Sequence, residues 1–311
     1  MTKKILLLLT LTLFSTNLKA EEAIIEAIET TETVDVDVVE AQKLTPPPVE
    51  AKPSDLRLNI KRVGLDIVST EVKNADQYQN SSVTALSADS ETNIKAVFDS
   101  ALEYQQEKYR WDNSLYMVYG ETKTKPVNGE EVKNISDDQI LLSSDLAYKL
   151  WKYEEANVGP FVNVGYDTQF KKSGDAPRRK IVRGKSGIKL FNGKYISNLY
   201  IAGVVEHDMT YSEDVEKFAM EVGGSAKYPL REGVDFKVEG YYRDYMHFSK
   251  YMPEDLKYDL NVTGRMNVDI VKNYKISPFV SYRYAESRVA TKAGSNFTVG
   301  LSFNYGNIFD L

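Results

Sequence analysis

The sequence predicts an all-β protein: a closed antiparallel transmembrane β-barrel of about twelve strands, preceded by a disordered N-terminal segment. Three observations support this fold class. Long segments alternate apolar and polar residues, the connections between them alternate in length, and aromatic residues gather near segment ends. The clearest segment is 256–270, LKYDLNVTGRMNVDI, which alternates over its whole length. A period of two predicts a strand whose two faces meet different surroundings.

Residues 1–20 have the pattern of a secretory signal peptide. Lys3 and Lys4 form a basic start, residues 5–14 form a short apolar core, and LKA before Glu21 offers a cleavage site. The apolar core is too short to span a bilayer. We therefore expect an exported protein, located in the cell outer membrane.

Residues 21–55 differ in composition from the rest of the chain. They contain ten carboxylates, two lysines, no aromatic residue and a run of prolines at 46–48. Such a segment cannot bury enough apolar surface to fold alone, and its prolines favour extended backbone. We expect a disordered acidic tether in the periplasm, available to bind a periplasmic partner.

Residues 56–311 contain one alternating segment after another and form the predicted barrel. An even strand number is usual for bacterial barrels. The alternation breaks near Arg62, which predicts either a β-bulge or a later start of the first strand. The twelve predicted strands cover residues 56–70, 92–105, 109–123, 139–151, 156–171, 180–191, 195–211, 215–229, 234–249, 256–270, 274–286 and 295–306.

The connections alternate between short turns and longer polar loops. Short connections follow the even strands, whereas most odd strands are followed by longer ones such as 71–91, 124–138 and 172–179. In outer-membrane barrels the short turns face the periplasm and the long loops face outward. This arrangement places both ends of the barrel segment at the periplasmic rim.

A soluble periplasmic barrel or sandwich is the alternative explanation for the alternation. A tilted membrane strand needs about 9–11 residues, whereas globular strands usually have about 5–6, and most of the predicted strands are long. In a membrane barrel the apolar phase faces lipid, with amphipathic rings at both interfaces. The aromatic residues that we expect there are Trp111, Tyr119, Tyr148, Phe170, Tyr211, Tyr228, Phe248, Tyr258, Tyr284, Phe297 and Tyr305.

The last predicted strand has the pattern recognised by the barrel-assembly machinery. Phe297, Phe303 and Tyr305 belong to one phase, and polar residues occupy the other. Six residues, 306–311, follow Tyr305, so the usual terminal aromatic is displaced, although Phe309 could serve in its place. We expect the assembly machinery and outer-membrane lipid to be partners.

The polar phase carries charges that we expect to face the lumen. Strand 180–191 supplies a ladder of one sign, and its neighbours supply carboxylates such as Glu206, Glu221 and Asp259, with Lys257 in the same phase. Ion pairs could fill the lumen, or a charged lining could orient permeating solutes. The candidate pore-lining residues are Arg183, Lys185, Lys189, Arg243, Arg265, Arg283, Asp145 and Asp167.

Composition excludes several kinds of site. The absence of cysteine excludes disulfides and thiolate metal sites. With only two histidines we expect no metal centre and no cofactor, and a net charge of −6 gives no support to nucleic-acid binding. The carboxylates Glu206 and Asp208 flank His207 and could hold a divalent ion, but ordinary rim carboxylates are the simpler expectation.

One pair of residues raises the question of catalysis. His247 and Ser249 lie two residues apart, the spacing used by an outer-membrane phospholipase. That chemistry also needs a residue that orients the imidazole and an oxyanion site. We expect both side chains to face the lumen, and no Asn or Asp is placed to complete the set. We therefore expect no enzyme, and a lipid hydrolase is the most remote hypothesis.

Three segments carry a family resemblance. Residues 103–125 (EYQQEKYRWDNSLYMVYGETKTK), 140–150 (ILLSSDLAYKL) and 161–170 (FVNVGYDTQF) resemble the salt-induced outer-membrane-protein-like family of poorly characterised bacterial barrels. The resemblance implies an outer-membrane barrel and brings no catalytic residues.

Two functional hypotheses remain. The first is a narrow passive channel for small solutes. The second is a non-conducting structural or envelope-interaction barrel whose lumen is filled by side chains. Eight strands enclose a filled interior and sixteen a wide channel, so a twelve-stranded barrel is compatible with both.

Overall fold

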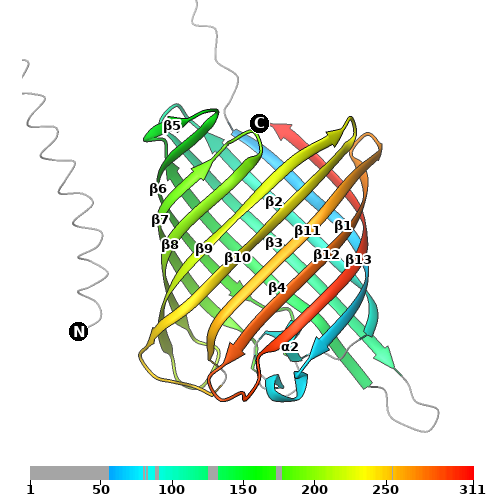
Figure 1. Cartoon of the computed structure of the whole chain (residues 1–311), viewed down its shortest axis with the longest axis vertical. Coiled ribbons are helices and arrows are strands. Elements are labelled where there is room, and N and C mark those ends of the chain that lie inside the picture. The colour runs from blue at the N-terminus through cyan, green and yellow to red at the C-terminus, as the bar shows by residue number, and fades with distance from the viewer. Residues whose placement is uncertain are drawn as a thin grey trace, which may run out of the picture. The chain divides into compact units, whose positions relative to one another are not determined.

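The computed structural model describes residues 56–311 except 80, 82, 88–90, 125–131, 173–176 and 254. The predicted signal peptide and acidic tether lie outside the described residues. The strands form one closed antiparallel barrel (Figure 1). They are β1 Leu56–Lys73, β2 Glu91–Gln105, β3 Tyr109–Thr124, β4 Val132–Tyr148, β5 Trp151–Tyr153, β6 Ala156–Thr168, β7 Lys180–Phe191, β8 Ile196–Asp208, β9 Val215–Arg231, β10 Val234–Phe248, β11 Leu256–Val271, β12 Tyr274–Ser287 and β13 Gly294–Asp310.

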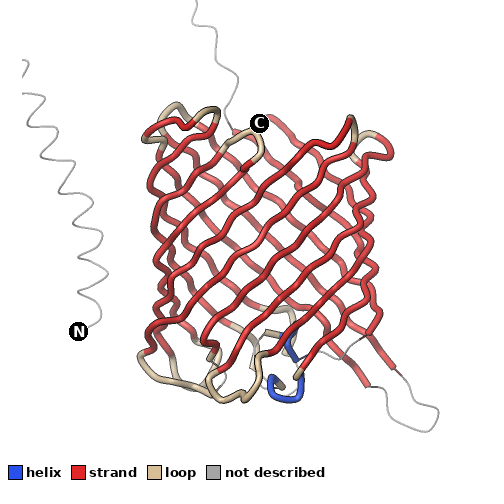
Figure 2. Tube along the Cα trace, in the orientation of Figure 1, coloured by secondary structure: helices blue, strands red, loops and turns tan. Residues whose placement is uncertain are grey.

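The barrel is a meander of neighbouring strands whose first and last strands pair with each other. Strands β1 and β13 pair from Arg57↔Asp310 to Lys73↔Ser295. Strands β4 and β6 pair from Ile140↔Thr168 to Ala147↔Phe161, which completes the ring. Figure 2 shows the strands running obliquely around the wall. Among the described residues, closure leaves the twelve strands without an unpaired edge inside the wall, so the ladder satisfies their backbone polar groups there.

The prediction of twelve wall strands is confirmed, with β5 as one short additional strand. Strand β5 pairs with β6 alone, through Trp151↔Val158 to Tyr153↔Ala156. It continues the direction of β4 after a break at residues 149 and 150. The wall therefore has twelve positions, and β5 extends one hairpin at its tip.

The two ends of the barrel differ as predicted. Five tight connections and both ends of the barrel segment lie at one end, here called the short-turn end, which is at the top of Figure 1. Asn192, Gly233 and Asn273 adopt positive φ in these turns, a conformation that Gly and Asn tolerate best. The opposite end, here called the long-loop end, carries the longer connections.

Most predicted strand boundaries agree closely with the structure, and the largest difference is in β4. This strand begins at Val132 instead of near residue 139, so β3 and β4 extend as a hairpin beyond the wall (Figure 1). The bulge predicted near Arg62 is confirmed, because the register of β1 shifts between Ile60 and Arg62 on one side and between Ile60 and Val63 on the other. Strand β1 begins at Leu56.

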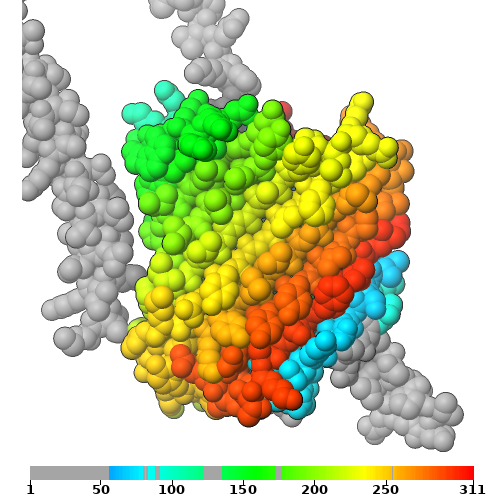
Figure 3. Space-filling model, viewed as in Figure 1, coloured from blue at the N-terminus to red at the C-terminus, as the bar shows by residue number. Residues whose placement is uncertain are grey.

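The outer face of the wall is apolar around its middle. Ile188, Ile201 and Val222 are register neighbours on three consecutive strands, and each is about half exposed. Figure 3 shows the wall from outside, with strands β9–β13 on the visible face. Soluble monomers rarely expose contiguous apolar surface beyond a few hundred Å². An exposed belt that follows the barrel is typical of a lipid-facing surface.

Three expectations about orientation are wrong, and local irregularities explain them. A register shift between Tyr245 and His247 turns Phe248 inward, where it is 3% exposed, and places His247 opposite Phe218 on the outer face. Tyr211 lies beyond the end of β8 and lines a lumenal cavity instead of facing lipid.

The first residues of β11 are also reversed. A register irregularity between Leu256 and Tyr258 turns Leu256 toward the lumen, where it packs beside Tyr78 and Leu86. Lys257, expected in the lumen, forms a partly exposed ion pair with Glu286 outside the lumen. The sequence alternates without interruption across residues 256–258, although the strand register shifts there.

A small insert occupies the long-loop end. It contains a 3₁₀ helix, η1 (Ala75–Tyr78), and the single-turn helix α2 (Thr84–Ser87). In the described part of the chain, neither helix approaches the length and apolarity of a membrane-crossing helix. The Tyr78 hydroxyl donates to Ala285 O at 3.2 Å and accepts from Gly294 N at 2.8 Å. These bonds fix the insert against β12 and β13.

Candidate functional site

The candidate site is the lumen. The inner wall carries all eight predicted pore-lining residues, which are Asp145, Asp167, Arg183, Lys185, Lys189, Arg243, Arg265 and Arg283. Seven of them form ion pairs with other inward-facing side chains, and Arg265 does not within the described residues. The basic ladder of β7 is therefore neutralised by its surroundings.

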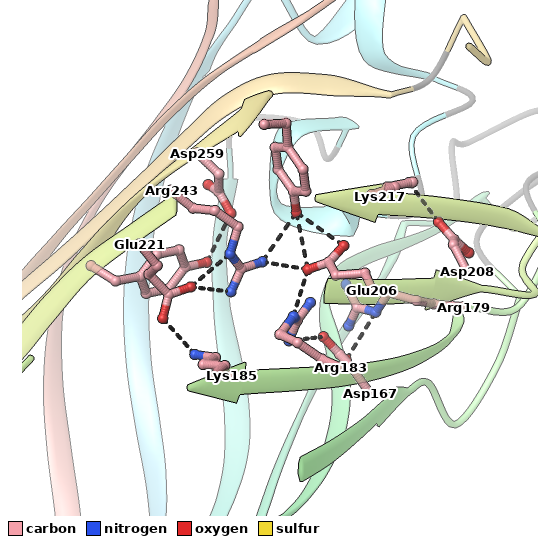
Figure 4. Close-up of polar contacts among 12 residues, drawn as sticks. Asp167, Arg179, Arg183, Lys185, Glu206, Asp208, Lys217, Glu221, Arg243 and Asp259 are labelled. Carbon is pink, nitrogen blue, oxygen red and sulfur yellow. Dashed lines mark hydrogen bonds and ion pairs between the residues drawn. The ribbon is translucent and has the colours of Figure 1, made fainter. Parts of the chain in front are cut away.

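Arg243 is the centre of the largest network (Figure 4). Its Nη1 donates to Glu206 Oε1 at 2.9 Å, and its Nε donates to Glu221 Oε2 at 2.6 Å. Glu206 and Glu221 have side-chain exposures of only 1% and 0%, so each must be compensated inside the protein. The Tyr245 hydroxyl also donates to Glu206. One guanidinium thus bridges two buried carboxylates.

The ladder on β7 supplies the second cation for each carboxylate. Arg183 Nε donates to Glu206 Oε1 at 2.5 Å, and Lys185 Nζ donates to Glu221. Arg183 also lies 3.8 Å from Asp167 Oδ2. The strand register explains the first contact, because Arg183 faces Glu206 directly across β7 and β8. The network therefore follows from strand pairing.

Two further groups of charges lie beside this network. The Arg283 guanidinium forks onto Asp259 with N–O distances of 2.9 and 2.7 Å, and the Tyr241 hydroxyl donates to the same carboxylate at 2.8 Å. Lys217 Nζ lies 2.7 Å from both Asp208 and Asp255. Bidentate and shared pairs of this kind are geometrically specific.

The polar lumen is incompletely filled and contains two cavities. The first, here called the β1-side cavity, has a volume of about 370 Å³ and reaches the short-turn end at Lys227 and Asp235. The second, the β8-side cavity, has a volume of about 460 Å³ and reaches the long-loop end at Tyr211 and Asp255. Seven residues line both cavities, and Tyr116 is one of them. These shared residues form the waist between the two cavities.

The insert at the long-loop end contributes to both cavities. Ala85 lines the β1-side cavity, whereas Ser81 and Val83 line the β8-side cavity. Asn296 Nδ2 donates to Ala85 O at 2.7 Å, which connects the insert to the inner face of β13. The insert therefore narrows the lumen at this end.

Several lumenal residues did not stand out in the sequence. Arg62 follows the bulge in β1, where alternation could not assign a face. Tyr116, Tyr241 and Tyr245 face the lumen, and none of them was among the aromatic residues or the charged residues singled out in the sequence. For these tyrosines, position within the phase was the available signal, because the residue two positions before each of them (Ser114, Glu239 and Arg243, respectively) is polar and belongs to the inward phase.

The residues considered for catalysis and metal binding are not assembled into such a site. No hydrogen bond links the side chains of His247 and Ser249, and Ser249 Oγ accepts from Glu216 N at 2.9 Å. Glu206 and Asp208 face inward and pair with cations, while His207 faces outward near Asp214. Among the described residues, no group of three or more potential ligands could hold a metal ion.

Comparison with sequence families gives one match. Residues 82–173 match the family described as Protein of unknown function (DUF3078), which covers 92 of the 311 residues. This stretch contains all three segments that carry the resemblance described above, although the matching family has a different name, so that resemblance remains a prediction. No curated protein matches the chain.

Comparison with solved structures gives membrane barrels of low similarity. An outer membrane channel from Pseudomonas putida F1 has 10% identity and a TM-score of 0.45, covering 85% of this chain and 100% of that one. The outer membrane channel DcaP of Acinetobacter baumannii has 9% identity and a TM-score of 0.44, covering 82% and 98%. Outer membrane phospholipase A from Escherichia coli has 12% identity and a TM-score of 0.42, covering 85% and 95%. With TM-scores below 0.5, function must be argued from this chain's own residues.

Proposed function

We propose that this protein is an outer-membrane β-barrel that passes small polar solutes through its lumen by passive diffusion. The observation that carries the proposal is the pair of polar cavities, which together reach from one end of the barrel to the other and share seven lining residues. In the outer membrane the short-turn end would face the periplasm and the long-loop end would face outward, as in other barrels of this kind.

The apolar belt supports the membrane location. Leu65, Val164 and Val205 are 55–60% exposed in the isolated chain and lie on the outer face of three different strands. In water their exposure would be unfavourable, at about 25 cal/mol per Å² of apolar surface. Hydrocarbon covers this surface, and the closed ladder satisfies the backbone, which is the requirement for a sheet in lipid.

The size of the cavities supports small solutes. The β1-side and β8-side cavities are each comparable to a single ligand site, not to a wide channel. The ion network of Arg243, Glu206 and Glu221 occupies the β7–β10 side of the lumen, and the insert narrows the long-loop end. Passage is therefore restricted to solutes that fit the waist.

Single-channel recording in planar lipid bilayers tests the proposal. The wild type should give discrete conductance steps, and Tyr116→Ala should increase the step size because it removes a ring from the waist. Tyr242→Ala is the matched control, since Tyr242 is 45% exposed on the outer face and should leave conductance unchanged. Silence of the correctly inserted wild type would refute the channel, whereas equal conductance of the Tyr116 variant and the wild type would refute the placement of Tyr116 at its narrowest point.

A non-conducting structural barrel is the second candidate, and the packing of one side of the lumen favours it. Phe161 and Phe191 are buried with Ala147 and Ala202 near the short-turn end, and Tyr200 packs against them. If this packing and the charge network block the path, all variants should be electrically silent. In either case we propose that β13 is recognised by the assembly machinery and that residues 21–55 bind a periplasmic partner.

A further inference from the structure

One guanidinium of the β1-side cavity lacks a carboxylate partner. Eight cationic side chains line this cavity, and seven of them have a carboxylate oxygen within 4 Å. Within the described residues Arg265, on β11, has none. Its neighbour Lys237, directly opposite on β10, is already paired with Glu239 at 2.5 Å.

Arg62 pairs with Asp66 directly, and Arg265 is connected to the same carboxylate through the Ser302 hydroxyl. Arg62 Nη2 lies 3.4 Å from Asp66 Oδ2. Arg265 Nη1 donates to Ser302 Oγ at 2.7 Å, and Ser302 Oγ donates to Asp66 Oδ1 at 2.5 Å. Asp66 is 4% exposed. Two guanidinium groups connected to one carboxylate leave one positive charge in excess, facing a cavity.

Arg265 is held in position without being neutralised. Its guanidinium carbon lies 4.6 Å from the centroid of the Phe279 ring, which lines the same cavity. Stacking on a ring and one hydrogen bond to a neutral hydroxyl leave other N–H donors of the planar fork available. Such a fork matches the geometry of a carboxylate.

A buried acceptor without a partner lies close to this cation. Asn304 lines the cavity and is 8% exposed; its Nδ2 donates to Ser277 Oγ at 3.2 Å, while its Oδ1 has no hydrogen-bond partner. Asn304 follows Ser302 by two residues on the inner face of β13, a separation of about 7 Å along a strand. This oxygen is buried against Gly64, so a ligand hydroxyl satisfies it only when the Asn304 amide turns toward the cavity.

We propose that the β1-side cavity binds a small hydroxylated carboxylate. Its carboxylate lies between Arg62 and Arg265, and one of its hydroxyls donates to Asn304 Oδ1 after the Asn304 amide turns toward the cavity. The inference rests on the proposed function, because it places a solute site on the path through the barrel and names the class of solute.

Isothermal titration of the refolded full chain in detergent micelles tests the inference, with sodium gluconate as the probe. Gluconate should bind saturably, whereas glucose, which lacks the carboxylate, should not. Arg265→Gln should weaken gluconate binding about tenfold or more, and Asn304→Ala about threefold. Lys257→Gln removes the same charge from a partly exposed pair outside the lumen and should leave the affinity unchanged.

Further variants separate binding from folding. Arg265→Lys keeps the charge without the fork and should have intermediate affinity. Because Arg265→Gln removes a surplus charge, heat-modifiable gel migration should show it to be as stable as the wild type. Equal affinity of folded Arg265→Gln and wild type, or no saturable gluconate binding, would overturn the inference. Gluconate binding by an electrically silent barrel would instead overturn only the proposed function.

Discussion

Replacing Ile201 by arginine should destabilise the barrel strongly if the outer face meets hydrocarbon. Ile201 is 51% exposed in the isolated chain and lies near the middle of β8, between Ile188 on β7 and Val222 on β9. An arginine on the lipid face at the bilayer midplane costs about 2–4 kcal/mol. The folding equilibrium constant should therefore fall about 30- to 900-fold.

The matched control is an arginine at the end of a strand. Val271 is 62% exposed and is the last residue of β11, at the short-turn end. At this depth Val271→Arg should cost only about 0–1 kcal/mol, because the guanidinium reaches the headgroups. The two substitutions are chemically alike, so the difference between them reports depth in the membrane.

Reversible guanidinium unfolding of the refolded protein in phospholipid vesicles is the assay, with gel-shift migration as the measure of the folded fraction. In a water-soluble barrel both half-exposed sites would tolerate arginine within about 0.5 kcal/mol. If Ile201→Arg and Val271→Arg change the free energy of unfolding equally, the assignment of the belt to lipid is wrong.

Two further substitutions test the interior. Arg243→Met should lower the free energy of unfolding by about 3–5 kcal/mol, because it leaves Glu206 and Glu221 with one cation each. The control Lys250→Met breaks an exposed pair and should lower the free energy of unfolding by at most about 1 kcal/mol. Similar losses for both variants would contradict the importance of the network. Tyr78→Ala should increase single-channel conductance, because Tyr78 anchors the insert that narrows the long-loop end; an unchanged conductance would show that the insert lies off the path.

The strand pattern was predictable because the membrane imposes one rule on every wall strand. Each strand must present one face to hydrocarbon, so alternation continues over its full length. Local irregularities were predictable only where they disturbed that alternation. The bulge beside Arg62 interrupts the phase visibly, whereas the shift beyond Tyr245 does not, because Met246 and Phe248 are both apolar.

The candidate site was predictable in part for the same reason. Phase alone placed Arg183 and Arg243 in the lumen, because inward residues are the polar set. Their partners depend on strand register, which the sequence does not specify across long loops. The bridging role of Arg243 and the isolation of Arg265 therefore emerged only from the closed barrel, as did the insert, whose helices are single turns.

Tryptophan quenching by brominated lipids tests the central claim, contact of the outer face with lipid, most directly. The chain has two tryptophans, and the Trp151→Phe variant leaves Trp111, which is 44% exposed on the outer face near the short-turn end. The account predicts strong quenching by lipids brominated near the headgroup and weaker quenching by lipids brominated near the bilayer centre. Tryptophan fluorescence that is unchanged by brominated lipids and fully quenched by aqueous iodide would contradict contact of the outer face with lipid.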